Sequence, residues 1–463
     1  MKQAKNVTSL LFFCAIACAG IGQLQPVYIF QKDDTLLKKK YYEQSFQKKK
    51  DLLASLSKEN ASDYKKIYDE QFDEIGNFLQ TTRSVTAPEA HSYLQSVLQK
   101  IIAANKELNG LVVRVVFSRD WWPNAYSMGD GTIAINAGLM IYLKNEAELA
   151  FVLCHELSHY YLNHTSKAIK KYVEAVNSEE VQQELKRLSK EQYRVNQQVE
   201  KLAMSLVFDS RLHSRSNEAE ADLQAFNFMK RTAYDCNAIK TTLQLLDRID
   251  DSLLYKPLDP EQVFNFSEYP FKKKWIQNES AIFSQLDKND SPLSQKEKDS
   301  LKTHPDCSRR TLLLTDSIQS IIAAGKDFLI DEKVFNKLKR DFFIEMTEQC
   351  FHADNLSRNL YYNMLLLQSN ENIPIAVYSV ARDLNMIYEN QKNHTVGLII
   401  EPENRKYPGD YNLLLLMLGR LRLDEITSLN YYFCKQHYEQ MKGYAGFSEE
   451  IKKIQAQQKQ VTN

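Results

Sequence analysis

The segment that most constrains the fold is the run from Asn145 to His164, NEAELAFVLCHELSHYYLNH. Asn145 followed three residues later by Glu148 is the pattern of a capping box, which predicts that a helix begins here. No Gly or Pro interrupts the run, and its first turns have no polar face. We therefore expect a helix that is buried on all sides rather than a surface helix.

Three polar residues, His155, Glu156 and His159, interrupt this apolar helix. Burying such groups without partners is costly, so we expect a ligand that satisfies them. His155 and His159 are four residues apart, so both imidazoles lie on one helix face and can reach a single metal ion. Glu156 lies beside them as the candidate catalytic carboxylate. This HExxH spacing is typical of zinc peptidases and predicts one Zn²⁺ per chain.

A catalytic zinc usually has three protein ligands, and the sequence after the helix must supply the third. Leu162 and Thr165 occupy the positions at which a metzincin has a glycine and a third histidine, so that class is excluded. His164 is nine residues from His155, which places it roughly on the opposite face of a continuous helix. We therefore interpret His164 as a structural residue.

The best source of a third ligand is the later segment SRSNEAEAD, which contains Glu218 and Asp222 four residues apart. One of these carboxylates can bind the zinc while the other holds a ligating histidine through its second ring nitrogen. Glu220 points about 200° away from Glu218 around the same helix, so we do not expect it at the metal. The alanines between these acids allow the helix to pack closely against a neighbour.

The composition predicts a mainly helical protein. Only 13 Gly and 11 Pro occur in 463 residues, and neither type occurs between Gly138 and Pro257. Strand character precedes the buried helix, at the Val-rich residues 111–118 and at Thr132–Asn136, which alternates after the turn signal Asp130-Gly131. We expect an α+β fold, mainly α with a small β-sheet. Lys plus Arg and Asp plus Glu both number 59, so the charge does not favour a nucleic-acid partner.

The amino terminus has the pattern of a secretory signal peptide over residues 1–22. Lys2 and Lys5 precede the apolar run 9–21, which is shorter than the roughly 20 apolar residues of a membrane span. Cys18 follows Ala-Ile-Ala, which is an alternative signal for a lipid anchor. We therefore expect an exported protein, with soluble and lipid-anchored forms both open.

The rest of the chain divides into three regions. We expect an N-terminal helical segment over 23–84, a zinc-binding domain over 85–308 and a helical domain over 309–463. Within the second region, 165–213 carries a heptad stripe typical of a long helical insertion, and the proline-containing stretch 255–308 is expected to form a covering loop. The last region has helix pairs at 355–390 and 410–441 that resemble tetratricopeptide repeats, although no fixed period repeats. No apolar run after the signal is long enough for a transmembrane span.

Three motifs follow one another in the order of a known family: the segment from Asn124 to His164, then SRSNEAEAD, then THPDCSRR. Together they resemble the metallopeptidase family of the CAAX prenyl proteases, HtpX and the BepA proteins, peptidase family M48. Because the chain lacks transmembrane segments, the periplasmic BepA-type members are the most similar branch, and these carry a helical repeat domain after the protease. The resemblance implies a gluzincin-type zincin domain with its site residues assigned as follows: His155, His159 and Glu218 as zinc ligands, Glu156 as the catalytic carboxylate and Asp222 as their support.

The resemblance also implies that His304, in the Thr-His-Pro segment, approaches the zinc in a closed form. The stretch between Glu218 and His304 is about twice as long as in compact members. Arg215 and His304 are the candidates for supporting the transition-state oxygen. The candidate edge strand for pairing with an extended substrate by β-augmentation consists of Thr132, Ile133, Ala134, Ile135 and Asn136.

These features predict a zinc metalloendopeptidase in the periplasm or at the envelope. Its expected substrates are unfolded or misassembled envelope proteins, which it would cleave in quality control. The alternative is a non-catalytic chaperone or scaffold whose helical repeats bind envelope proteins while the zinc site is structural. Glu156 argues against the alternative, since a structural zinc site needs no carboxylate beside the water.

Overall fold

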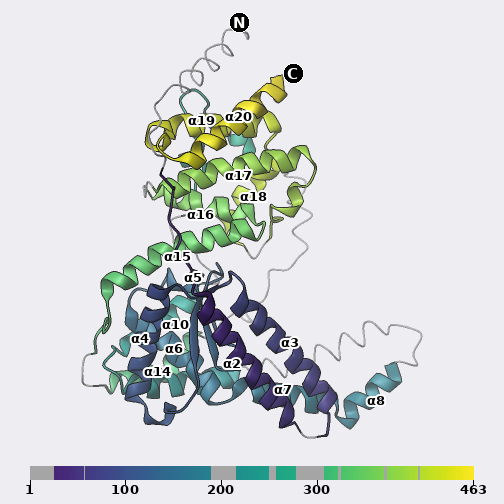
Figure 1. Ribbon diagram of the computed structural model, residues 1–463, viewed down its shortest axis with the longest axis vertical. Coiled ribbons are helices and arrows are strands. Elements are labelled where there is room, and N and C mark those ends of the chain that lie inside the picture. Colours follow the sequence, from purple (N-terminus) through teal and green to yellow (C-terminus); the bar gives the residue numbers. More distant parts are fainter. Residues whose placement is uncertain are drawn as a thin grey trace. The chain divides into compact units, whose positions relative to one another are not determined.

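The computed structural model describes residues 25–56, 58–188, 215–249, 257–277, 307–321, 325–369, 373–404 and 407–462 (Figure 1). These residues form two compact units. The sheet unit takes its residues from 30–256 and 278–353, and the helical unit takes them from 1–29, 257–277 and 354–463. The expected signal peptide over 1–22, including Cys18, lies outside the described residues.

The sheet unit contains a four-stranded sheet in the order β1-β2-β4-β3. Its strands are β1 (Ser84–Val85), β2 (Arg114–Ser118), β3 (Ala125–Ser127) and β4 (Thr132–Asn136). β2 and β4 are parallel, whereas β1 and β3 pair antiparallel to their neighbours and form the two edges. All residues of β2 and β4 are buried, as expected for strands with a partner on each side.

The prediction that Thr132–Asn136 forms an edge strand is wrong. Ile133 of β4 lies opposite Val115 of β2, and Ala134 lies opposite Tyr126 of β3, so β4 is an inner strand. Alternation along β4 predicted a strand correctly, because it depends on local sequence. The parallel pairing with β2 depends on a distant segment, and no local pattern indicates it.

The sheet unit also contains helices. They are α2 (Thr35–Ala54), α3 (Ala61–Gln80), α4 (Pro88–Ala104), α5 (Ala137–Met140), α6 (Glu146–Tyr161), α7 (His164–Val176), α8 (Glu179–Leu188), a helix over 215–229, α10 (Asn237–Ile249), α14 (Cys307–Gln319) and α15 (Glu332–His352). α2 and α3 pack against each other (Figure 1). Phe72 and Ile75 of α3 join a core cluster with Val116 of β2 and Ala134 of β4. α3 buries the apolar residues that recur every three or four positions along it, as expected for an amphipathic helix.

The helical unit consists of helices and one inserted segment. The helices are α16 (Leu356–Gln368), α17 (Pro374–Lys392), α18 (Gly409–Arg420), α19 (Leu423–Met441) and α20 (Ala445–Thr462). α17 packs against α16, α19 and α20. The expected mainly helical α+β composition is therefore confirmed, while the similarity to tetratricopeptide repeats stays a prediction.

The inserted segment is Pro257–Gln277, which contains α11 (Pro260–Phe264). The Leu258 N–H donates to Asp410 at 2.8 Å, and Phe264 packs against Phe433 with ring centroids 6.0 Å apart. Trp275 is buried in the same unit. We expected this segment to belong to a loop that covers the zinc-binding domain, but its aromatic side chains are buried among the helices of the helical unit.

Two further expectations concern the boundaries of the sheet unit. α14 and α15, which we expected in the C-terminal domain, belong to the sheet unit, where Phe342 of α15 contacts Phe117 of β2 at 4.5 Å between ring centroids. α7 and α8 are helical as predicted for the insertion over 165–213, and its residues from 189 onward lie outside the described part. Within the described segments, no helix combines the length and apolarity needed to cross a bilayer.

Candidate metal centre

α6 begins as the sequence predicts. The Asn145 side chain caps the helix by accepting a hydrogen bond from the Glu148 N–H at 2.9 Å, and the Glu148 side chain accepts from the Lys144 N–H at 2.7 Å. Every residue from Glu146 to Ser158 is buried. The first turn is also anchored from outside, because the Glu146 carboxylate accepts hydrogen bonds from the hydroxyls of Tyr93 and Tyr234.

The histidines of α6 converge with Glu218, which lies on the helix over 215–229. The Nε2 atoms of His155 and His159 lie 3.1 Å apart, and the Glu218 carboxylate lies 3.5 Å from His155 Nε2 and 3.3 Å from His159 Nε2. Atoms that are each about 2.0–2.1 Å from a tetrahedral zinc lie roughly 3.3–3.4 Å from one another. The donor atoms and their spacing therefore fit a zinc ion with three protein ligands.

Two buried residues hold these ligands. Asp222 Oδ1 lies 2.9 Å from His155 Nδ1, so the second nitrogen of that ring is engaged and Nε2 is directed to the cluster. Arg310 of α14 pairs with Asp222 through Nε at 2.6 Å and Nη2 at 2.8 Å, and its Nη1 lies 2.9 Å from Glu218. Arg310 thus connects α14 to both carboxylates of the helix over 215–229, which we call the acidic helix.

The carboxylates determine the electrostatics of the centre. Burial lowers the pKa of His155, but Asp222 and Glu218 outweigh this effect and raise that pKa to about 10. Burial opposes ionisation of Glu218, yet His155, His159 and Arg310 hold its pKa well below the usual value. A site that stabilises a proton on His155 so strongly also favours a metal cation, because the cation and the proton compete for the same nitrogen.

His164 lies against the ligands and not on the far side of the helix. α6 ends at Tyr161, Asn163 adopts a left-handed backbone with φ of 55°, and His164 begins α7. This break turns His164 back, so that its Nδ1 lies 3.0 Å from His159 Nδ1. Its Nε2 lies 3.1 Å from Glu220, which stays outside the ligand cluster. The assumption of one continuous helix was therefore wrong.

The remaining candidates differ in how the structure places them. Glu156 is buried on α6, immediately after His155. Arg215 lies on the same helix as Glu218, three residues before it, and its role stays a prediction. His304 lies outside the described residues. Sequence reasoning missed Arg310, although it is the last residue of the THPDCSRR motif.

The edge of the sheet beside this centre is β3, which packs against α6. Asn136 N donates to Asn124 O, and Met128 N donates to Thr132 O, so alternate residues of β3 bond to β4. The backbone N–H and C=O groups of Ala125 and Ser127 consequently point away from β4. Within the described part of the chain, these groups form a strand edge without a paired neighbour next to the ligand helix.

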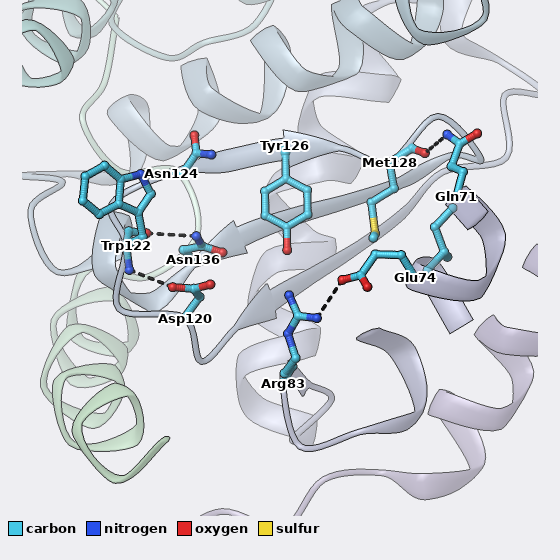
Figure 2. A pocket seen from close by; sticks show the side chains of 10 residues that line it. Gln71, Glu74, Arg83, Asp120, Trp122, Asn124, Tyr126, Met128 and Asn136 are labelled. Atoms are coloured by element: carbon cyan, nitrogen blue, oxygen red, sulfur yellow. Dashed lines mark hydrogen bonds and ion pairs between the residues drawn. The ribbon is translucent and has the colours of Figure 1, made fainter. Parts of the chain in front are cut away.

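A pocket of about 380 Å³ lies on the face of the sheet that α3 covers. Figure 2 shows Tyr126 of β3 and Met128, the residue that follows β3, on one side of it and the Arg83–Glu74 ion pair on the other, with N–O distance 2.8 Å. The indole of Trp122 lies at one end of the pocket and is 39% exposed. None of its lining residues is a member of the ligand cluster, so the pocket is a feature separate from the metal centre.

Part of the chain matches a known protein family. Residues 88–317 match the family described as peptidase family M48, and this region contains α6, the acidic helix and Arg310. No curated protein matches the chain.

Proposed function

Since the match over residues 88–317 supports membership of peptidase family M48, a metallopeptidase family, we propose that this protein is a zinc-dependent endopeptidase of the BepA type. Its proposed role is hydrolysis of exported proteins during envelope quality control. The observation that carries the peptidase assignment is the convergence of His155, His159 and Glu218 at zinc-ligand spacing, with Glu156 on the same helix. The signal-peptide pattern of residues 1–22 supports exported substrates.

The residues of the centre have different roles in the proposed peptide hydrolysis. When bound, a zinc ion supplies Lewis acidity, which lowers the pKa of water and polarises a carbonyl group. The Glu156 carboxylate takes the proton of the attacking water and later delivers it to the leaving amine. Asp222 holds His155, and Arg310 holds Glu218 and Asp222, so the ligands are in place before substrate arrives.

The substrate is proposed to pair with β3, in place of β4, because β3 is the edge strand of the described sheet that packs against α6. An extended peptide would use the outward N–H and C=O groups of Ala125 and Ser127. Such backbone recognition requires an unfolded or extended segment but no particular side chain. This requirement fits a peptidase that acts on unfolded proteins.

Side chains of a paired substrate would alternate between the two faces of the sheet. Those opposite Tyr126 would point to the face that carries the pocket shown in Figure 2, and those opposite Ala125 and Ser127 would point to the other face. The pocket has aromatic walls, Trp122 and Tyr126, and two carboxylates with one guanidinium. Aromatic or basic substrate side chains are therefore the best candidates for it.

The test compares the purified protein with Glu156→Gln for bound zinc and for cleavage of an unfolded protein. Equal zinc in both, with cleavage reduced about 10²–10⁴-fold in the variant, supports a peptidase in which Glu156 handles the proton. Equal zinc with no cleavage by either protein would favour a chaperone or scaffold with a structural zinc site. Absence of zinc from both would reject the metal centre.

A further inference from the structure

The two candidate histidine ligands have different supports. His155 contacts Asp222 directly, whereas His159 contacts His164, which in turn contacts Glu220. His164 is buried with 4% of its surface exposed, and Glu220 is half exposed. We infer that His164 is a positioning residue that, together with Glu220, fixes the ring of His159 for metal binding. This inference rests on the proposed zinc site.

The position of each proton follows from the donor and acceptor capacities of imidazole. If His159 binds a metal through Nε2, that atom carries no proton, so the proton of the neutral ring is on Nδ1. His159 Nδ1–H can then donate only to an acceptor, which makes the facing Nδ1 of His164 the acceptor. The proton of His164 is consequently on Nε2, where it donates to the Glu220 carboxylate at 3.1 Å.

Each ligating histidine is therefore connected to a carboxylate by hydrogen bonds. Asp222 acts on His155 in one step, and Glu220 acts on His159 in two steps through His164. Hydrogen bonds of this kind select the ring orientation and make the ligating nitrogen more basic. Glu220 and Asp222 therefore support the two histidines from the helix that also supplies the ligand Glu218.

The architecture explains how His164 reaches this position. Asn163 has a left-handed backbone, with φ of 55°, between α6 and α7. His164, the first residue of α7, is thereby directed to His159, five residues earlier. A continuous helix would have carried it away from the ligands.

The experiment measures the zinc dissociation constant of the full-length protein by competition with a chelator of known affinity. His164→Phe keeps a ring but removes both nitrogens, and we expect zinc binding to weaken about 10–100-fold. His164→Asn can retain an acceptor near the former Nδ1 and should recover part of this loss. Glu220→Gln should weaken binding by a few-fold, since its carboxylate is half exposed.

Two comparisons separate positioning from a merely structural role. Glu220→Gln added to His164→Phe should cause no further loss, because Glu220 acts only through His164. Glu174→Gln, which removes an exposed carboxylate from α7, should leave zinc binding unchanged. Additive effects in the double variant, or a His164→Phe protein that folds and binds zinc within about twofold of the wild type, would overturn the inference.

A spectroscopic readout identifies which histidine is affected. In the protein loaded with Co²⁺, the ring N–H protons of ligating histidines give exchangeable, strongly shifted proton resonances. His164→Phe should shift one of them or speed its exchange with water, and Asp222→Asn should affect the other. Failure of the wild-type protein to bind zinc or cobalt would count against the proposed function, whereas binding without these differences would count against His164 alone.

Discussion

Arg310 and Asp222 form a two-point ion pair, with contacts of 2.6 and 2.8 Å, between helices whose paired residues are 88 positions apart in the sequence. Both side chains are almost completely buried. Arg310 also contacts Glu218, so one guanidinium balances two carboxylates. These contacts make α14 part of the metal centre although it contributes no ligand.

Replacing Arg310 with Met should destabilise the protein, because two buried carboxylates lose their cation. The cost of leaving such charges unpaired is about 3–5 kcal/mol in the metal-free protein. It should be smaller with zinc bound, since the metal supplies positive charge at the same place. Thermal unfolding with and without a chelator measures both quantities. Arg309→Met is the matched control, because Arg309 is exposed, and equal effects of the two substitutions would contradict the pairing.

Glu218→Ala should abolish tight zinc binding, because it removes one of three ligands. We expect a loss of at least about 100-fold in zinc affinity, larger than the effect of any residue that only supports a ligand. The exposed neighbour Ser216, replaced with Ala, provides a control on the same helix. Normal zinc content in purified Glu218→Ala would show that the third ligand comes from elsewhere.

Ser127→Pro should impair cleavage and preserve zinc binding. Proline removes the outward N–H that is proposed to bond the substrate, and an edge strand tolerates it where that N–H does not serve the sheet. Loss of one such hydrogen bond is expected to lower kcat/KM by about tenfold. Ser127→Ala retains the N–H, and the hydroxyl that it removes has no hydrogen-bond partner among the described residues. Equal activity of the two variants would remove β3 from the substrate site.

The stability of the metal-free protein should decrease above neutral pH. The folded pKa of His155, about 10, exceeds its ordinary value of 6.5, so this group stabilises the fold fully below pH 6.5 and progressively less up to about pH 10. Glu218 and Asp222 have lowered pKa values, so their contribution is present above their ordinary values, 4.5 and 3.8, and disappears in stronger acid. Thermal unfolding in chelator between pH 5 and 10 tests the prediction, and Asp222→Asn should flatten the alkaline decline.

Zinc binding should also release protons in this pH range. At about pH 8 the metal-free His155 is still an imidazolium with a proton on each nitrogen, and the proton on Nε2 must leave before that atom can bind the metal, while Nδ1–H stays bonded to Asp222. Calorimetric titration with zinc in buffers of different ionisation enthalpy counts the protons released. We expect release to be about one proton per site larger at pH 8 than above pH 10, because only the contribution of His155 disappears as the pH rises, and equal release at the two pH values would contradict the prediction.

The sequence predicted those parts of the centre that lie within single helices. His155 with His159, and Glu218 with Asp222, are four residues apart, and helical geometry places such pairs on one face. Arg310 was missed because its partners lie on another helix, and its pairing depends on how α14 packs. His164 was misplaced because the change of direction at Asn163 is a backbone conformation that residue type only weakly indicates.

For the sheet too, the local sequence predicts that a segment is a strand but not which strands it pairs with. The strand character of β4 follows from its alternating residues, but its inner position follows from pairing with β2 on one side and β3 on the other. The short strand β3 has too few residues for a clear pattern. The sequence also did not predict the boundaries of the two units. Trp275 is buried among helices that come much later in the sequence, and no local pattern indicates this.

The segment Pro257–Gln277 determines how shortened forms of the protein must be designed. It lies between the acidic helix and α14 in the chain but buries Phe264 and Trp275 in the helical unit. A chain truncated after residue 353 would therefore keep these aromatic residues and lose their partners. If such a fragment were inactive, the reason would be aggregation through its exposed aromatic side chains. The result would not show that the helical unit takes part in substrate recognition. A fair fragment would also replace residues 257–277 with a polar linker.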